Sequence, residues 1–173
     1  MTSSPALSPA VSPPTLDVRP IAPEVLRALR TLDDAGRPPV RSTDTAGGAP
    51  LRCCLTRARP GEQILLLSYA PLRRWAAASG TDPGPYDEQG PVFVHAGDCP
   101  GPAGDWPRDL HQGDRVVRCY DAGGRILRGR AAGPAEVRQA VTEELADPEV
   151  AVVHVRALAF GCFLHEVRRG PAA

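Results

Sequence analysis

Alternating apolar and polar residues predict that most of this chain folds into short β-strands. Residues 16–19 read Leu-Asp-Val-Arg, with the period of two that a strand with one buried face requires. Residues 64–67, Ile-Leu-Leu-Leu, are apolar at every position, which is typical of a central strand that is covered on both faces. The same criteria predict further strands near residues 51–58, 92–95, 115–120, 125–130, 150–156 and 160–168.

Two segments have the apolar spacing of a helix. The first begins near Pro23, a residue that suits a first helical turn, and ends before Gly36. The second follows Gly133-Pro134, carries an apolar residue about once per turn and ends at Asp147-Pro148. A further helical turn is expected at residues 72–78, inside a long loop rich in proline and glycine.

The balance of helices and strands sets the expected fold class. Two helices are too few to link every pair of strands by a parallel crossover, so the strands should pair mostly antiparallel. We therefore predict an α+β fold with a mostly antiparallel sheet of about six to eight strands and two main helices. Residues 1–15 contain mainly proline, serine and alanine and are predicted to form a disordered tail. Residues 16–169 are predicted to form a single domain, and residues 170–173 a short C-terminal tail.

Charge and hydropathy exclude several partners. The 173 residues include 20 basic and 20 acidic side chains and no strongly basic segment, so nucleic acid is not an expected partner. The run of about 18 apolar residues that a membrane helix needs is missing, so no membrane contact is expected. The chain has no pattern of a secretory signal, and its five cysteines are therefore expected to be reduced thiols in a cytoplasmic protein.

The residue types that are missing narrow the chemistry further. All 20 basic residues are arginine, a usage typical of GC-rich bacterial genomes. Without lysine, the chain cannot form a Schiff base through a lysine amine. The sequence also lacks the motifs of phosphate-binding loops, dinucleotide-binding folds, zinc proteases and serine hydrolases.

Polar residues that interrupt the apolar strands suggest a binding site for a small anionic molecule. Guanidinium groups bind carboxylate and phosphate oxygens through paired hydrogen bonds, and two loops rich in proline and glycine could form the rim of a pocket. The alternative is that each arginine is solvated or pairs with a nearby acidic residue. The leading hypothesis is thus a small-molecule-binding domain. Its predicted ligand-binding residues are Arg52, Tyr69, Tyr86, His95, Arg118 and Tyr120.

A second hypothesis is a metal-assisted or cysteine-dependent enzyme. His95 and Cys99 are four residues apart at the end of a strand, and Cys54, His154 or Cys162 could join them around a divalent metal ion, with Cys54 the preferred third ligand. Alternatively, Cys54 could act as a nucleophile with His95 as its base, although the sequence identifies no acidic residue to orient the histidine. Cys53 is adjacent to Cys54, and on a strand the two would point to opposite faces. A third hypothesis is a structural or protein-interaction domain.

Several segments in the same order resemble a bacterial family known only as domain of unknown function 1203. They include residues 52–55 (Arg-Cys-Cys-Leu), 60–62, 90–95, 118–121, 153–156 and 161–163, and the resemblance extends over roughly residues 16–169. It implies a small stand-alone bacterial domain without an established activity. Many members have Pro-Cys-Arg-His-Cys-Leu at residues 50–55, where this chain has Leu51 and Cys53 in place of the first cysteine and the histidine. A metal site on that family cluster would therefore lose two ligands here and retain Cys54, His95 and Cys99.

Overall fold

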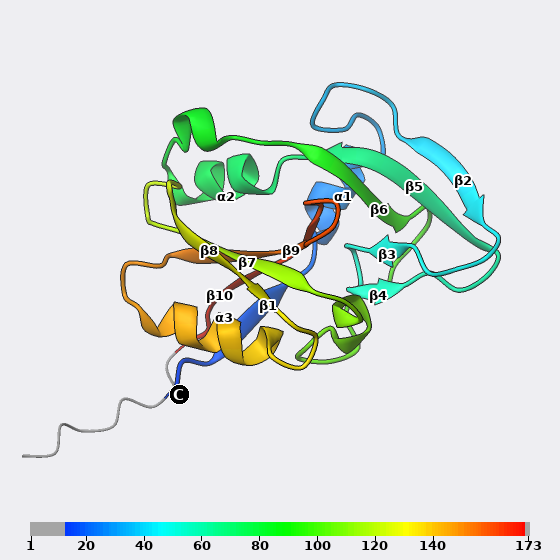
Figure 1. Ribbon diagram of the computed structural model, residues 1–173. Coiled ribbons are helices and arrows are strands. Elements are labelled where there is room, and N and C mark those ends of the chain that lie inside the picture. Colours follow the sequence, from blue (N-terminus) through cyan, green and yellow to red (C-terminus); the bar gives the residue numbers. More distant parts are fainter. Residues whose placement is uncertain (1–12, 172–173) are drawn as a thin grey trace, which may run out of the picture.

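Two five-stranded sheets form the framework of the protein (Figure 1). The computed structural model describes residues 13–171. The first sheet contains β1 (Leu16–Arg19), β7 (Arg115–Tyr120), β8 (Ile126–Ala132), β9 (Val152–Ala157) and β10 (Phe163–Arg169), in the spatial order β1-β10-β9-β7-β8. The second contains β2 (Val40–Asp44), β3 (Pro50–Leu51), β4 (Thr56–Arg57), β5 (Glu62–Tyr69) and β6 (Gly90–His95), in the order β2-β5-β6-β3-β4. Every pairing is antiparallel except that of β3 with β6.

Three α-helices cover these sheets. They are α1 (Pro23–Leu29), α2 (Pro71–Ser79) and α3 (Val137–Ala146), and two 3-10 helices, η1 (Gly84–Tyr86) and η2 (Arg108–His111), lie in the connections. Figure 1 shows α3 packed along the first sheet, with α2 near the end of that sheet. Between residues 13 and 171, none of the helices combines the length and the apolar character that crossing a bilayer would demand.

Each sheet has its own apolar core. In the first, α3 buries Val137, Val141 and Leu145 against strands β7, β9 and β10. In the second, Leu26 and Leu29 of α1 pack against the apolar side of β5 and β6. Full burial of a side chain of this size stabilises a fold by about 1.5–3 kcal/mol, so these two helix faces hold the layers together.

The predicted α+β class and the mostly antiparallel pairing are confirmed. The ten strands are divided between two sheets, whereas the sequence suggested one sheet of six to eight. The division arises because β6 pairs with β5 and β3, and the loop at residues 97–113 then carries the chain across to β7, which pairs with β8 and β9. Helix α2 also extends over nine residues where only a helical turn was expected.

The pairing of β1 with β10 continues one residue beyond each strand. The Gly170 amide donates a hydrogen bond of 2.7 Å to the Thr15 carbonyl and so extends the pairing of β1 with β10. In the sequence prediction, Thr15 belongs to the N-terminal tail and Gly170 to the C-terminal tail. The rest of the predicted N-terminal tail up to residue 12, and residues 172 and 173, lie outside the described residues.

A buried histidine pair joins the crossing loop to the first sheet. His111 and His165 are 3% and 0% exposed, and their Nε2 atoms are 3.0 Å apart. Trp106 stacks on the His111 ring at a centroid distance of 5.0 Å. Burial, with a smaller contribution from Arg115, lowers the pKa of His111 to about 4, and burial also lowers the pKa of His165. Both rings are therefore neutral at pH 7, and one donates a hydrogen bond to the other.

This pair should make the fold sensitive to acid. Below pH 6.5 the unfolded chain binds more protons than the folded chain, so the free energy of unfolding should fall as the pH decreases toward 4. The expected loss is about 1.4 kcal/mol per pH unit for each histidine that stays neutral only in the folded state. Urea unfolding between pH 7.5 and pH 4.5 measures this dependence. The variant His111→Leu should show a shallower dependence, and an unchanged one would contradict the assignment.

Candidate metal centre

A tight turn at residues 52–55 places two adjacent cysteines on the same side of the backbone. The Leu55 amide donates to the Leu51 carbonyl at 2.9 Å, which closes the turn. Leu55 adopts a φ of 59°, a left-handed conformation that costs a non-glycine residue about 1–2 kcal/mol. Its side chain is only 2% exposed, and this burial offsets the backbone cost. The segment is therefore a turn, and the expectation that Cys53 and Cys54 point to opposite faces of a strand is wrong.

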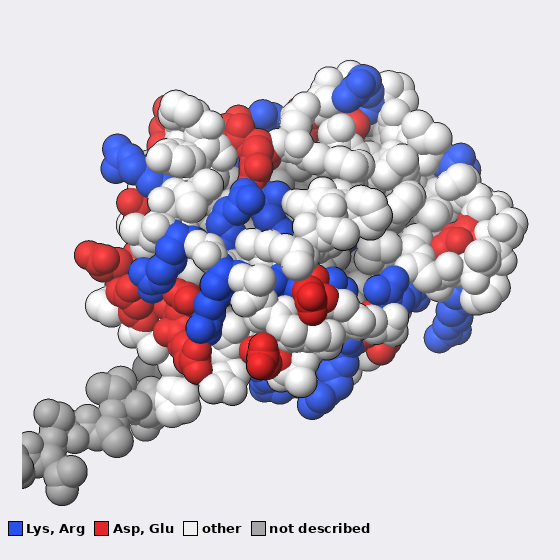
Figure 2. Space-filling view, in the orientation of Figure 1, with Lys and Arg blue, Asp and Glu red and all other residues white. Residues whose placement is uncertain are grey.

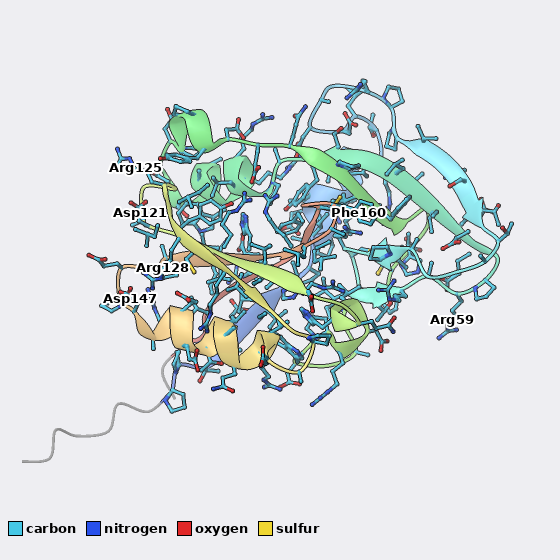
Figure 3. All side chains as sticks on the ribbon, viewed as in Figure 1. Arg59, Asp121, Arg125, Arg128, Asp147 and Phe160 are labelled. Atoms are coloured by element: carbon cyan, nitrogen blue, oxygen red, sulfur yellow. The ribbon has the colours of Figure 1, made fainter. Side chains whose placement is uncertain are left out.

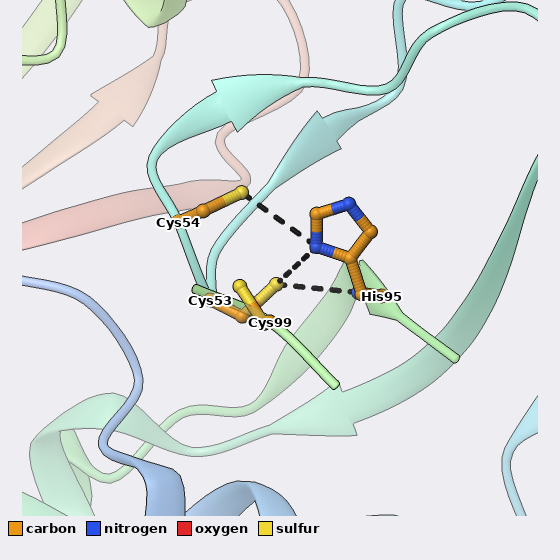
Figure 4. A group of neighbouring side chains, drawn as sticks. All are labelled: Cys53, Cys54, His95 and Cys99. Carbon is orange, nitrogen blue, oxygen red and sulfur yellow. Dashed lines mark hydrogen bonds between the residues drawn. The ribbon is translucent and has the colours of Figure 1, made fainter. Parts of the chain in front are cut away.

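The end of β6 supplies the other half of the site. His95 is the last residue of this strand, and Cys99 follows in the loop. The Sγ atoms of Cys53 and Cys54 are 3.3 Å and 3.7 Å from His95 Nδ1, and both point toward that ring nitrogen (Figure 4). With Cys99 Sγ, the four donor atoms all lie within 4.8 Å of one another.

A glutamate orients the histidine ring. Glu62 opens β5, which pairs with β6, and its Oε2 atom lies 3.5 Å from His95 Nε2. A carboxylate at this position favours the tautomer that carries its proton on Nε2. Nδ1 is then left with a free lone pair, directed at the three sulfur atoms. The same carboxylate oxygen accepts a hydrogen bond from the Arg59 amide at 2.9 Å, which fixes its position.

The thiols of the cluster influence one another's ionisation. The Cys53 thiol donates a hydrogen bond that lowers the pKa of Cys54 to about 5, and the Thr56 hydroxyl, 3.2 Å from Cys54 Sγ, contributes to this. The same shared proton and burial raise the pKa of Cys53, and burial raises the pKa of Cys99. Three thiolates cannot lie this close together without a compensating cation, and a divalent metal ion would supply that charge.

The arrangement fits a tetrahedral metal ion. Bonds of about 2.3 Å to sulfur and about 2.0–2.1 Å to nitrogen place neighbouring donors about 3.5–3.8 Å apart in a tetrahedron. The separation of 3.7 Å between Cys54 Sγ and His95 Nδ1 falls in this range, and that of 3.3 Å from Cys53 Sγ lies just below it. Because all four donors lie within 4.8 Å of one another, movements of about 1 Å or less would complete the tetrahedron. Three thiolates and one imidazole form a donor set that is typical of structural zinc sites.

Comparison with known proteins identifies the family. A family model described as protein of unknown function (DUF1203) matches residues 48–169, which include all four members of the cluster and Glu62. The chain belongs to this family. No curated protein and no solved structure matches it. The geometry of this DUF1203 protein is therefore the basis for any inference about its function.

In this DUF1203 protein, the cluster contains the three metal ligands predicted from the sequence, Cys54, His95 and Cys99, and adds Cys53. The resemblance to the family implies that this chain lacks two metal ligands, at positions 51 and 53. Leu51 does lie fully buried in β3 and offers no donor. Position 53 keeps a donor, however, because a thiolate can replace the imidazole of other family members.

The six residues predicted to line one anion pocket do not come together. Arg118 pairs with Glu88 at 2.6 Å, beside a small cavity that Tyr69 also lines. Tyr120 is fully buried under α2, and Tyr86 lies in an exposed 3-10 helix. His95 belongs instead to the cluster that it forms with Cys53, Cys54 and Cys99. Arg52 lies on the opposite side of its turn, where its Nε donates to the Phe163 carbonyl at 2.8 Å.

Proposed function

We propose that this DUF1203 protein holds one zinc ion through Cys53, Cys54, His95 and Cys99. The observation that carries the proposal is the convergence of four nitrogen and sulfur donors from two separate segments within 4.8 Å. Thiolate and imidazole donors favour zinc over magnesium or calcium, which prefer oxygen. With all four positions taken by protein, such an ion has a structural role and no open site for substrate.

The surroundings explain what the ion would stabilise. Strands β3 and β4, which flank the turn, contain two residues each and form few hydrogen bonds. The loop after β6 contains only the short helix η2 before β7 begins. A metal ion bound to both segments would fix the turn against the end of β6 and the start of this loop. Its charge would also allow the clustered thiols to ionise together.

Metal analysis of purified protein tests the proposal directly. We expect about one equivalent of zinc per chain when the protein is prepared under reducing conditions. Cys99→Ser should lose most of this metal, since a serine hydroxyl is a poor zinc ligand, and the half-buried position makes misfolding of the variant a smaller concern. Cys162→Ser, which lies outside the cluster, is the matched control and should keep its zinc. Zinc far below one equivalent in both parent and control, even after reconstitution, would refute the proposal.

Removal of the metal should also lower thermal stability. A ligand present at about 1,000 times its dissociation constant stabilises the folded state by about 4 kcal/mol. For a domain of this size that corresponds to a rise of roughly 8–16 °C in the unfolding midpoint. Calorimetry of the metal-free protein, with and without one equivalent of zinc, measures the shift. Cys99→Ser should show little response, and an equal response in both proteins would place the zinc elsewhere.

The glutamate next to His95 should tune the affinity. Glu62→Gln keeps an oxygen that can accept from the Arg59 amide but removes the charge opposite Nε2–H. Loss of such a partner typically lowers metal affinity about 10–100-fold, and we expect the lower end of this range. Competition titration with a chromophoric chelator provides the measurement, with the exposed Glu149→Gln as the control. An affinity unchanged by Glu62→Gln would exclude the orienting role.

A second candidate function is thiol catalysis at Cys54. It is favoured by the place of Cys54 on the wall of a surface hollow of about 270 Å³, with His95 beside its sulfur and Glu62 behind the histidine. This chain of nucleophile, base and orienting acid is the arrangement that thiol enzymes use. Iodoacetamide labelling of the metal-free protein tests it: labelling of Cys54 should be rapid and should slow in His95→Gln. Slow labelling that does not depend on His95 would leave only the zinc site.

A further inference from the structure

A second cavity lies between the two sheets, on the other side of the turn that carries the cysteines. It has a volume of about 730 Å³, within the range of small-molecule sites. Its walls come from β3, β6 and η2, from the start of β7 and from the loop between β9 and β10. Most of the lining is apolar and includes the fully buried Leu110 and the half-buried Leu66 and Phe93.

The rim of this cavity exposes unusually large apolar side chains. Phe160 is 86% exposed and Leu158 is 47% exposed, and both lie on the loop between β9 and β10. Figure 3 labels Phe160 beside this loop, near the middle of the view. The surface over this part of the molecule is largely uncharged (Figure 2). An apolar ligand that entered the cavity would be covered by these side chains, which otherwise remain in water.

Three arginines line the same cavity, namely Arg52, Arg57 and Arg115. Arg52 and Arg115 are 3% and 8% exposed, and Arg57 is half-buried. Their guanidinium groups donate to backbone carbonyls. Arg57 Nε bonds to Asp109 O at 2.9 Å and Nη1 to Gly48 O at 2.7 Å, while Arg115 Nε bonds to Leu110 O at 2.9 Å.

None of the three arginines forms an ion pair within the part of the chain that the structure describes, and the charge of Asp114 offsets the burial of Arg115 only in part. No carboxylate there lies within 4.0 Å of their nitrogens. The only acidic residue in the lining is Asp114, which contributes its carbonyl oxygen to Arg115 at 2.7 Å and is exposed. Arg118 and Arg156, which are also partly or fully buried, by contrast share the carboxylate of Glu88.

Buried positive charge without a counter-ion is costly, because backbone carbonyls satisfy hydrogen bonds but do not neutralise charge. The cost is visible at Arg52, where burial, with a contribution from neighbouring Arg57, lowers the pKa to about 10. An anion in the cavity would compensate all three guanidinium groups at once. The apolar walls would at the same time reject a small, fully hydrated anion such as sulfate.

We propose that this cavity binds an organic monocarboxylate with an apolar body, of the type of a medium-chain fatty acid. Its carboxylate lies among Arg52, Arg57 and Arg115, and its apolar body packs against the walls formed by β6, η2 and the loop between β9 and β10. Guanidinium groups with remaining donor capacity suit a carboxylate, and one negative charge suits a site with few other polar groups. The proposal does not depend on the zinc site, since Cys53, Cys54 and Cys99 are not among the residues that line this cavity.

Titration calorimetry of the purified 173-residue chain separates the contributions of charge and apolar surface. The probes are decanoate, decanol and acetate. We expect saturable binding of decanoate at one site per chain, at least tenfold weaker binding of decanol and no detectable binding of acetate. Equal affinities for decanoate and decanol would show that the cavity binds apolar molecules in general and has no anion site. No binding of decanoate at its solubility limit would overturn the proposal altogether.

Variants locate the site. Arg115→Gln should weaken decanoate binding at least tenfold and leave decanol unchanged. Arg59→Gln is the control, because Arg59 is exposed and projects away from the body of the protein (Figure 3). Since Arg115 also supports the backbone, Phe160→Asp provides a second variant at an exposed position: it should weaken both decanoate and decanol binding without loss of stability. If decanoate binds equally to folded Arg115→Gln and Phe160→Asp, it binds elsewhere.

Discussion

Both candidate sites depend on the turn that is closed by the hydrogen bond from the Leu55 amide to the Leu51 carbonyl. It bends the chain directly after β3, so that the thiols of Cys53 and Cys54 turn toward the end of β6 while Arg52 turns into the cavity between the sheets. The first residue of the turn is fixed by two backbone hydrogen bonds to other segments. The Arg52 amide donates to Phe93 in β6 at 2.9 Å, and its carbonyl accepts from Ile21 at 2.8 Å.

The turn at residues 52–55 thus contributes to two candidate sites. Arg52 lines the cavity on one side of the backbone, and Cys53 and Cys54 belong to the cluster on the other. One is a compact set of soft donors, where like charges need a cation. The other is an apolar cavity, where buried guanidinium groups need an anion. A metal ion bound to the cysteines would also fix the backbone of Arg52, which gives zinc loading an indirect influence on the second site. The two proposals are nevertheless distinguishable, because each depends on different side chains and a different probe.

Local patterns in the sequence predicted the elements that depend on local interactions. The hairpin of β7 and β8 follows from the glycines between them, and α3 follows from its apolar spacing and its terminal prolines. Strand β2 was not predicted because Arg41, Ser42 and Thr43 are exposed at a sheet edge and have no apolar alternation. The turn at residues 52–55 gave no signal, because a leucine occupies the left-handed position that a glycine would have marked.

The candidate metal site was predictable only in part, because some of its residues are brought together by long-range contacts that leave no local pattern in the sequence. His95 and Cys99 are close in sequence at the end of a strand, so their proximity could be inferred. The contribution of Cys53 depends on the unexpected turn, and that of Glu62 on the long-range pairing of β5 with β6. The six residues of the predicted anion pocket are not brought together because Tyr120 and Arg118 belong to the first sheet, whereas His95 ends β6 of the second sheet and Arg52 lies in the turn after β3.

The coordination shell of the bound metal is the most direct test of this account, and X-ray absorption at the zinc edge measures it. The structure predicts a shell of three sulfur atoms at about 2.3 Å and one nitrogen at about 2.0–2.1 Å. A shell composed only of nitrogen and oxygen, or one with fewer than three sulfurs, would contradict the convergence of Cys53, Cys54 and Cys99 on a single ion.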